Sequence, residues 1–262
     1  MLEIDHSEVI TAPQISPGAL FFQFFKIRFA CANDMPQIFK LRYKIYCEEL
    51  GYFPNLAKKR LETDEYDSDA IHCVIEHKLT GKIVGCMRVV KTNLARLPLS
   101  TYLPHVKLKK RDIEISRVAV DPQYRQEVSG YKVPGLLFNA LLLAINHIIE
   151  QNSFDDVYIF IENSMRSALA RMGLKLEQTP HMASVACGNG KVSNKYLYRV
   201  DTHTRKQTRP LRMSQFVNQI GLYLYPEKFE RRVNPDSVCP AIVRQPSRQQ
   251  NEQQCPRGER PL

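Results

Sequence analysis

The 262-residue chain contains no tryptophan, and its seven cysteines include no pair at the CxxC spacing. An odd number of thiols without a framework pattern does not indicate a disulfide-rich secreted domain. The N-terminus also lacks a basic segment followed by an apolar run and a cleavage site, so no signal peptide is expected. These absences favour reduced thiols and a cytoplasmic location.

No apolar stretch is long enough to cross a membrane. The longest, residues 136–149, is interrupted by two asparagines and a histidine and is shorter than the ~20 residues of a spanning helix. It predicts a buried helix. His72 and His77 flank a predicted strand without a further ligand at metal-binding spacing, so neither a metal site nor a tightly bound cofactor is expected.

The composition is that of a folded protein with a basic surface. Hydrophobic residues make up 44% and charged residues 24%, and the length suffices for one α/β domain with a full core. The formal net charge is +10, which indicates an acidic partner or substrate because a basic surface concentrates anions. Nucleic acid, a phosphopantetheine-bearing carrier protein, coenzyme A and an anionic membrane surface all fit this charge.

Hydrophobic periodicity and turn residues predict an ordered series of elements. In chain order these are a strand (21–31), a helix (33–50), a polar loop (54–69), strands 71–77, 82–91 and 113–120, a helix (134–149), a strand (156–161), a helix (164–172) and a last strand (195–200). This order is typical of the α/β (α+β) fold of GNAT-type acyltransferases. In that fold a mixed, mostly antiparallel and splayed sheet is flanked by helices and opens a cleft for a pantetheine arm.

Composition also suggests three regions of the chain. Residues 1–20 are expected to be a loose leader, 21–225 the acyltransferase-like domain, and 226–262 a basic tail. The tail is poor in aliphatic residues and rich in Arg, Pro, Gln and Glu, which predicts disorder.

Charged residues stand at positions that a purely structural interpretation does not explain. Arg42, Tyr46 and Glu49 fall at i, i+4 and i+7, so they share one face of the first predicted helix. Arg88 lies inside an otherwise apolar strand. Burying such a charge is costly unless it is paired, so Arg88 predicts a polar pocket with carboxylate partners.

The partners of Arg88 are sought in the loop and in the next strand. Asp64 and Asp67 lie in the polar loop, whereas Glu114 and Arg117 are three apart on a strand and therefore face opposite sides if it is regular. We expect an ion-pair network of Asp64, Asp67, Arg88 and one member of the Glu114/Arg117 pair. Solvated strand edges explain any one of these charges taken alone, but they explain the whole set poorly.

These residues also follow a recognisable order along the chain. The series Arg42-x3-Tyr46, Leu50-Gly51-Tyr52, Glu62-x-Asp64-x-Tyr66-Asp67, Gly85-x2-Arg88 and Glu114-x-Ser116-Arg117-x-Ala119-Val120 resembles the signature of the N-acyl-homoserine-lactone (autoinducer) synthase family. With a later segment, residues 164–173, the resemblance covers roughly residues 25–200. It is closest to the acyltransferases associated with the PEP-CTERM/exosortase system. The usual tryptophan of the family is replaced by Tyr52 or Phe53.

The resemblance implies roles for individual residues. Acceptor binding falls to Arg42, Tyr46, Asp64, Asp67 and Arg88, and catalysis to Glu114 and Arg117. Separately, the expected fold predicts that the acyl or pantetheine group binds at Val118, Ala119 and Val120. An acceptor amine must lose a proton before it attacks a thioester, and Glu114 is the candidate base. Backbone N–H groups of the same strand could stabilise the oxyanion if the strand is bulged there.

The acyl donor is expected to be a carrier thioester, either acyl carrier protein or acyl coenzyme A. The segment 124–130 is a poor match to the Gly-rich loop that binds the coenzyme A pyrophosphate, which favours acyl carrier protein. Basic residues at 107–111 and 205–212 suit an acidic carrier, although each run is equally compatible with a solvated face.

The sequence therefore predicts an N-acyltransferase that moves a fatty acyl group to the amine of a small, amino-acid-like acceptor. One alternative is a true N-acyl-homoserine-lactone synthase using S-adenosylmethionine. The other is a non-catalytic module on the same fold that binds nucleic acid or an anionic surface through the +10 charge. Nucleic acid is not the expected partner, because the charged constellation suits chemistry.

Overall fold

The computed structural model describes residues 16–53, 59–92, 96–171, 174–188 and 190–201, together with 216, 219–221 and 224. All of them belong to one compact unit that ends at Pro226. The predicted tail (226–262), the basic run 205–212 and most of the predicted leader lie outside the described residues. The three-region division of the chain therefore stays a prediction.

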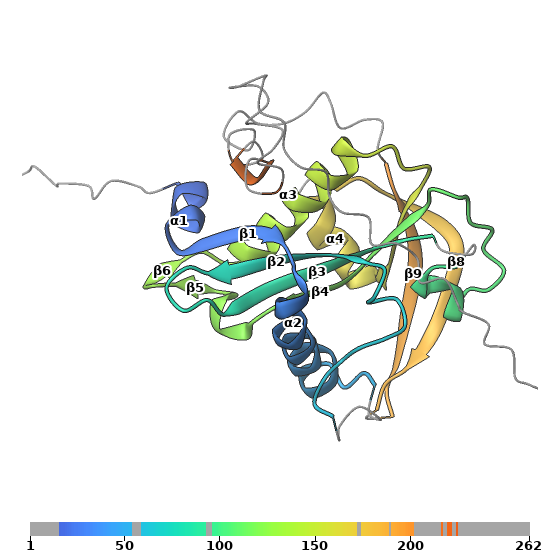
Figure 1. Cartoon of the computed structure of the whole chain (residues 1–262). Coiled ribbons are helices and arrows are strands. Elements are labelled where there is room, and N and C mark those ends of the chain that lie inside the picture. The colour runs from blue at the N-terminus through green and yellow to red at the C-terminus, as the bar shows by residue number, and fades with distance from the viewer. Residues whose placement is uncertain are drawn as a thin grey trace, which may run out of the picture. The chain divides into compact units, whose positions relative to one another are not determined.

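A seven-stranded sheet forms the centre of this unit, in the order β1-β2-β3-β4-β7-β9-β8 (Figure 1). Its strands are β1 (Phe25–Phe29), β2 (Ile71–His77), β3 (Ile83–Lys91), β4 (Ile113–Val120), β7 (Val157–Glu162), β8 (Leu176–Ala186) and β9 (Val192–Val200). Every neighbouring pair is antiparallel except β4 and β7, which are parallel. The predicted fold class, a mixed and mostly antiparallel sheet flanked by helices, is confirmed.

The sheet opens between its two parallel strands. β4 and β7 are paired only at their first residues, Ile113 with Val157 and Glu114 with Tyr158. From Ile115 onward no residue of β4 forms a ladder with β7. The free edge of β4 can therefore accept hydrogen bonds from, or donate them to, an extended ligand.

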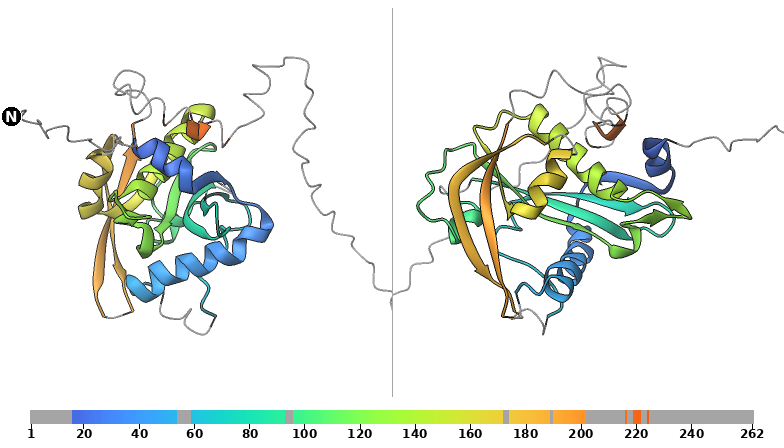
Figure 2. Two further views of the ribbon diagram at one scale, coloured as in Figure 1. Left: turned by 90° about the vertical axis from the view of Figure 1, so that its left-hand side faces the viewer. Right: turned by 180° about the vertical axis from the view of Figure 1, so that it is seen from behind.

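Helices cover both faces of the sheet (Figure 2). Because side chains alternate along a strand, Cys73 and Ile75 pack into the cluster of α3 (Leu136–Gln151), whereas Val74 packs against α2 (Met35–Arg42). The α2 helix continues without interruption as the π-helical segment η2 (Tyr43–Glu49). The face of the sheet under α2 and η2 is the one that carries the charged residues.

The first predicted strand (21–31) is wrong over residues 21–24. Residues Pro17–Phe24 form the helix α1, and β1 begins only at Phe25. Ser16 caps this helix by accepting a hydrogen bond from the Ala19 N–H at 3.2 Å, and proline occupies the first helical position. Phe21 is fully buried in the main core. Ordinary capping signals thus outweighed an aromatic run that favours β-structure.

The strand β8 is absent from the prediction, and β9 begins three residues earlier than expected, at Val192. Shorter elements were also not predicted. They are the helix η1 (Ala32–Asp34), the 3₁₀ helices η4 (Pro98–Thr101) and η5 (Pro122–Tyr124), and the small hairpin of β5 (Glu127–Val128) and β6 (Tyr131–Lys132). The predicted helix at 164–172 corresponds to α4 (Asn163–Arg171).

Three features bear on the expected chemistry. In the described ranges, no helix combines the length and apolar character needed to span a bilayer. The same ranges hold no cluster of three His, Cys, Asp or Glu side chains that could bind a metal ion. The five described cysteines are free thiols, and burial raises the pKa of Cys86 to about 12, so this thiol is protonated and a poor nucleophile.

Candidate active site

The polar loop after η2 is folded by its own carboxylates. Asp67 accepts a hydrogen bond from the Asp64 N–H at 2.9 Å, and Asp64 accepts one from the Tyr66 N–H at 3.0 Å. The Glu62 N–H donates to the carbonyl of Phe39 on α2 at 3.1 Å. The loop is thus pinned to α2, and its three carboxylates reach the sheet face beneath.

Three arginines meet these three carboxylates in a closed alternating ring, which we call the arginine–carboxylate ring. Arg42, at the end of α2, binds Glu62 through Nε and Asp67 through Nη1 at 2.6 Å. Arg88, on β3, binds Asp64 and, at 2.7 Å, Asp67. Each of these arginines is fully buried.

Arg117 closes the ring. Its Nε lies 2.9 Å from Glu62 and its Nη2 lies 3.1 Å from Asp64. Every arginine therefore contacts two carboxylates, every carboxylate contacts two arginines, and the formal charges cancel. Burial alone would raise the pKa of Asp67, but Arg42 and Arg88 lower it to about 2.

The expected ion-pair network is present, and the strand residue that joins it is Arg117. Glu62 was not among the predicted site residues, although it stands at the start of the loop motif. Glu62 is a full member of the ring, since only 1% of its surface is exposed and it binds both Arg42 and Arg117. The signal that could have found it is an acidic residue two positions before Asp64 in the same motif.

A β-bulge explains why Arg117 points to the ring. Arg88 pairs with Ser116 and Cys86 pairs with Ala119, so Met87 is opposed by both Arg117 and Val118. Arg117 adopts a positive φ of 54° at this point. The extra residue cancels the alternation of a regular strand, so the predicted opposite orientations of Glu114 and Arg117 do not apply.

Glu114 lies beside the ring without belonging to it. It is buried, and its Oε2 accepts a hydrogen bond from the Leu99 N–H at 2.6 Å. Burial raises the pKa of Glu114 to about 7, although the Leu99 N–H and the charges of Arg88 and Arg117 oppose this shift. A carboxyl group with such a pKa can take up and release protons near neutral pH.

Tyr46 fixes the bulge from the helical side. Its hydroxyl group donates a hydrogen bond to the Val118 carbonyl at 2.8 Å, and burial raises its pKa. The guanidinium of Arg117 lies 5.6 Å from the centre of the Tyr46 ring and 5.0 Å from that of Phe53. The aromatic residues of this region therefore position the backbone of Val118, next to the buried Ala119 and Val120.

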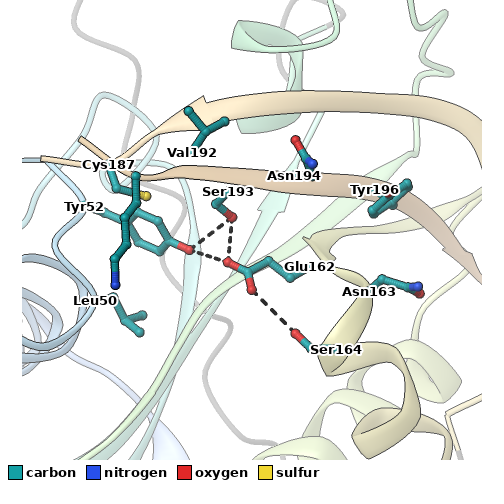
Figure 3. Close-up of a pocket in the computed structure, with 11 residues that line it drawn as sticks. Leu50, Tyr52, Glu162, Asn163, Ser164, Cys187, Val192, Ser193, Asn194 and Tyr196 are labelled. Atoms are coloured by element: carbon teal, nitrogen blue, oxygen red, sulfur yellow. Dashed lines mark hydrogen bonds between the residues drawn. The ribbon is translucent and has the colours of Figure 1, made fainter. Parts of the chain in front are cut away.

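A pocket of about 440 Å³ opens beside the wide end of the splay (Figure 3). In its wall, Glu162 accepts hydrogen bonds from the hydroxyl groups of Tyr52 at 2.8 Å and Ser193 at 2.6 Å. The hydrogen bond from Ser193 and, to a smaller extent, the one from Tyr52 lower the pKa of Glu162. The Nζ of Lys195 lies 4.4 Å from the centre of the Tyr52 ring.

The sequence did not single out Glu162, Ser193 or Lys195. They lie on β7 and β9, whose pairing joins residues 33 to 41 positions apart, and none interrupts an apolar run as Arg88 does. The only signal was Tyr52, which is one of the two aromatic residues, with Phe53, that could replace the tryptophan of the resemblance.

The segment expected to correspond to a pyrophosphate loop is folded onto itself. The Gly135 N–H donates to the Arg125 carbonyl at 2.8 Å, the Val133 N–H to the Gln126 carbonyl at 2.9 Å and the Leu136 N–H to the Val133 carbonyl at 3.1 Å. These N–H groups at the start of α3 are therefore already satisfied.

The predicted basic run 107–111 is partly neutralised. Lys109 pairs with Asp156 at 2.6 Å and Arg111 with Asp155 at 2.8 Å. The other two charged residues of this run, Lys107 and Lys110, form no ion pair with the described residues.

Known proteins resemble this chain in sequence and in fold. The family described as acetyltransferase (GNAT) domain matches residues 41–131. An acyl-homoserine-lactone synthase from Vibrio anguillarum is 26% identical over 151 residues, which is 55% of this chain and 76% of the relative. This chain is a homologue of acyl-homoserine-lactone synthases. It is accordingly an acyltransferase.

Solved structures show the same fold for the acyltransferase. The coenzyme-A-dependent acyl-homoserine lactone synthase BjaI with MTA has a TM-score of 0.55 at 17% identity, covering 75% of this chain and 90% of that one. The acyl-homoserine-lactone synthase LasI has a TM-score of 0.53 at 17% identity, covering 70% and 91% respectively. The GNAT-like architecture predicted from the order of elements is thus confirmed.

Proposed function

We propose that this acyltransferase moves a fatty acyl group from a carrier thioester to the amine of a small, amino-acid-like acceptor. The observation that carries the proposal is Glu114, a buried carboxyl group with a pKa raised to about 7 beside the arginine–carboxylate ring. A base for an ammonium substrate should have such a pKa, because it is then partly ionised at neutral pH and still basic enough to accept a proton.

The proposed reaction is a direct transfer. Glu114 removes a proton from the acceptor ammonium, directly or through a water, and the freed amine attacks the thioester carbonyl. The tetrahedral intermediate then collapses with formation of the amide bond and cleavage of the C–S bond, and the carrier leaves as its thiol. Backbone N–H groups at the bulge beside Val118 are the proposed oxyanion donors, since the expected bulge is present there.

The members of the arginine–carboxylate ring differ in exposure, so we propose different roles for them. The side chain of Asp64 is 23% exposed, compared with 1% for Glu62 and 7% for Asp67. We therefore assign contact with the acceptor ammonium to Asp64. Arg42 and Arg88, with Asp67, hold Asp64 in place, and Tyr46 holds the bulge.

The free edge of β4 is the proposed binding site for the pantetheine arm and the start of the acyl chain, at Val118, Ala119 and Val120. For the donor we favour acyl carrier protein over acyl coenzyme A. The internal hydrogen bonds of residues 125–136 leave fewer N–H groups for a pyrophosphate. The kinship with PEP-CTERM/exosortase-associated acyltransferases belongs to this proposal too, and it rests on the sequence motifs alone.

A true acyl-homoserine-lactone synthase is the second candidate. It is favoured by the sequence similarity to the acyl-homoserine-lactone synthase of Vibrio anguillarum. The replacement of tryptophan by Tyr52 or Phe53 argues for a different acceptor, because this aromatic position shapes the acceptor pocket in the family that the chain resembles.

The two candidates are separated by one assay. The purified full chain is incubated with decanoyl-carrier protein or decanoyl-coenzyme A, and with either the twenty amino acids or S-adenosylmethionine, and products are identified by mass spectrometry. N-decanoyl amino acids support the first candidate, and decanoyl-homoserine lactone supports the second. Products formed equally by the Glu114→Gln variant would remove Glu114 from the role of base, and absence of any acylated amine would refute both candidates.

A further inference from the structure

Lys195 lies at the open end of the splay, and it forms no ion pair within the part of the chain that the structure describes. In the register of β7 and β9 it stands opposite Glu162, and its ammonium lies over the ring of Tyr52. Among the described residues, no carboxylate forms an ion pair with it and no acceptor forms a hydrogen bond with it. Tyr52 is itself held by its hydrogen bond to Glu162. An aromatic face therefore holds this cation in a fixed place.

The surrounding charges favour an incoming anion. The arginine–carboxylate ring is neutral as it stands, because each of its three arginines is paired with two of its three carboxylates. Burial, and then the charge of Arg117, lower the pKa of Lys195, while Glu162 and Glu114 oppose the shift. An ammonium that is disfavoured in the free enzyme is stabilised when a negative group binds beside it.

We propose that Lys195 binds the carboxylate of the acceptor and so makes the enzyme select an acceptor with a free carboxylate over its amide. This inference rests on the proposed N-acyl transfer. The acceptor ammonium would approach Asp64 and Glu114, and its carboxylate would approach Lys195. The phosphate of a carrier is not the anion in question, because the whole pantetheine arm separates it from the thioester at Glu114.

The test uses matched acceptors and the full-length chain. Each amino acid is compared with its primary amide, which keeps the amine and loses the carboxylate, and decanoyl-carrier protein and decanoyl-coenzyme A serve as donors. We expect the wild type to prefer the acid, and Lys195→Met to lower kcat/KM for the acid about 10- to 100-fold through KM while the amide is unaffected. Lys195→Arg should keep part of the preference.

Arg199→Met is the control, because it removes a cation from the same strand whose partners are the exposed Glu177, at 2.7 Å, and Asp156, at 3.6 Å. It should leave both acceptors unchanged. Equal use of acid and amide by the wild type would overturn the role of Lys195 while leaving N-acyl transfer intact. A loss of kcat shared by all acceptors in Lys195→Met would also overturn it, since it would place Lys195 at the thioester oxygen. If the wild type acylates no amine, the proposed function fails and this inference fails with it.

Discussion

At the scale of single residues, charge in an unexpected place was the most informative signal. Arg88 was recognisable because it interrupts an apolar strand, and a buried arginine must find carboxylates. The same reasoning could not reach Glu162, which ends its strand, or Lys195, whose neighbours are polar. Their meeting with Tyr52 depends on three-dimensional packing that no local pattern encodes.

Glu114→Gln should separate catalysis from stability. Gln keeps an acceptor for the Leu99 N–H but cannot act as a base, so we expect kcat/KM to fall by about 10²- to 10⁴-fold with the fold intact. In the wild type, kcat/KM should rise as the pH passes through about 7, because the ionised form of Glu114 is the active one. Full activity in the variant would contradict the assignment.

The same variant gives a stability test with a definite sign. The carboxyl of Glu114 has a folded-state pKa near 7 and an ordinary value near 4.5 when unfolded, so the folded protein binds more protons between these pH values. Its contribution to the free energy of unfolding therefore falls as the pH rises from 4.5 to 7, by at most about 3 kcal/mol. Urea unfolding should show Glu114→Gln gaining relative stability across this window and no further above it.

Asp64→Asn and Asp67→Asn should behave differently although both residues bind two arginines. Asp67 is the more buried, so its variant should lose about 3 kcal/mol of stability because Arg42 and Arg88 lose a shared partner. Asp64→Asn should raise KM for the acceptor more than it changes KM for the thioester. Unchanged acceptor kinetics in Asp64→Asn would withdraw Asp64 from the acceptor site.

At the scale of elements, a strand could be predicted where its sequence is apolar and is bounded by turn residues. The core strands β2, β3 and β4 were predicted because they are apolar and bounded by turns. The edge strand β8 was not, because most of its residues are exposed, it contains Pro180, and its register shifts between Gln178 and Met182. Nothing in its sequence alternates as a half-buried strand does.

The bulge in β4 can be tested by substitution at Arg117. Arg117→Ala and Arg117→Gly both remove the guanidinium, so both should lose the ion pairs to Glu62 and Asp64 and most of the activity. The alanine variant must still adopt a φ of 54°, which costs a residue with a Cβ atom about 1 kcal/mol. We therefore expect Arg117→Gly to be the more stable of the two in urea unfolding, and the reverse order would mean that the bulge relaxes in the variants.

At the scale of the whole molecule, the net charge of +10 by itself did not choose a partner. In the described structure Lys109 and Arg111 are paired with Asp156 and Asp155, so only part of the predicted basic run 107–111 is unpaired. Lys107 and Lys110 are the remaining charges of the predicted carrier-binding run.

If these two lysines contact an acidic carrier protein, the double variant Lys107→Glu with Lys110→Glu should lower kcat/KM for decanoyl-carrier protein at least tenfold at low salt. The same variant should use decanoyl-pantetheine as well as the wild type does, since that donor has the reacting arm without the protein. Added salt should lower the wild-type rate with the carrier and narrow the gap between the two enzymes, because screening weakens interactions between exposed charges. Equal losses with both donors would show instead that the substitutions disturb the active site, and unchanged use of the carrier would move its binding surface away from residues 107–111.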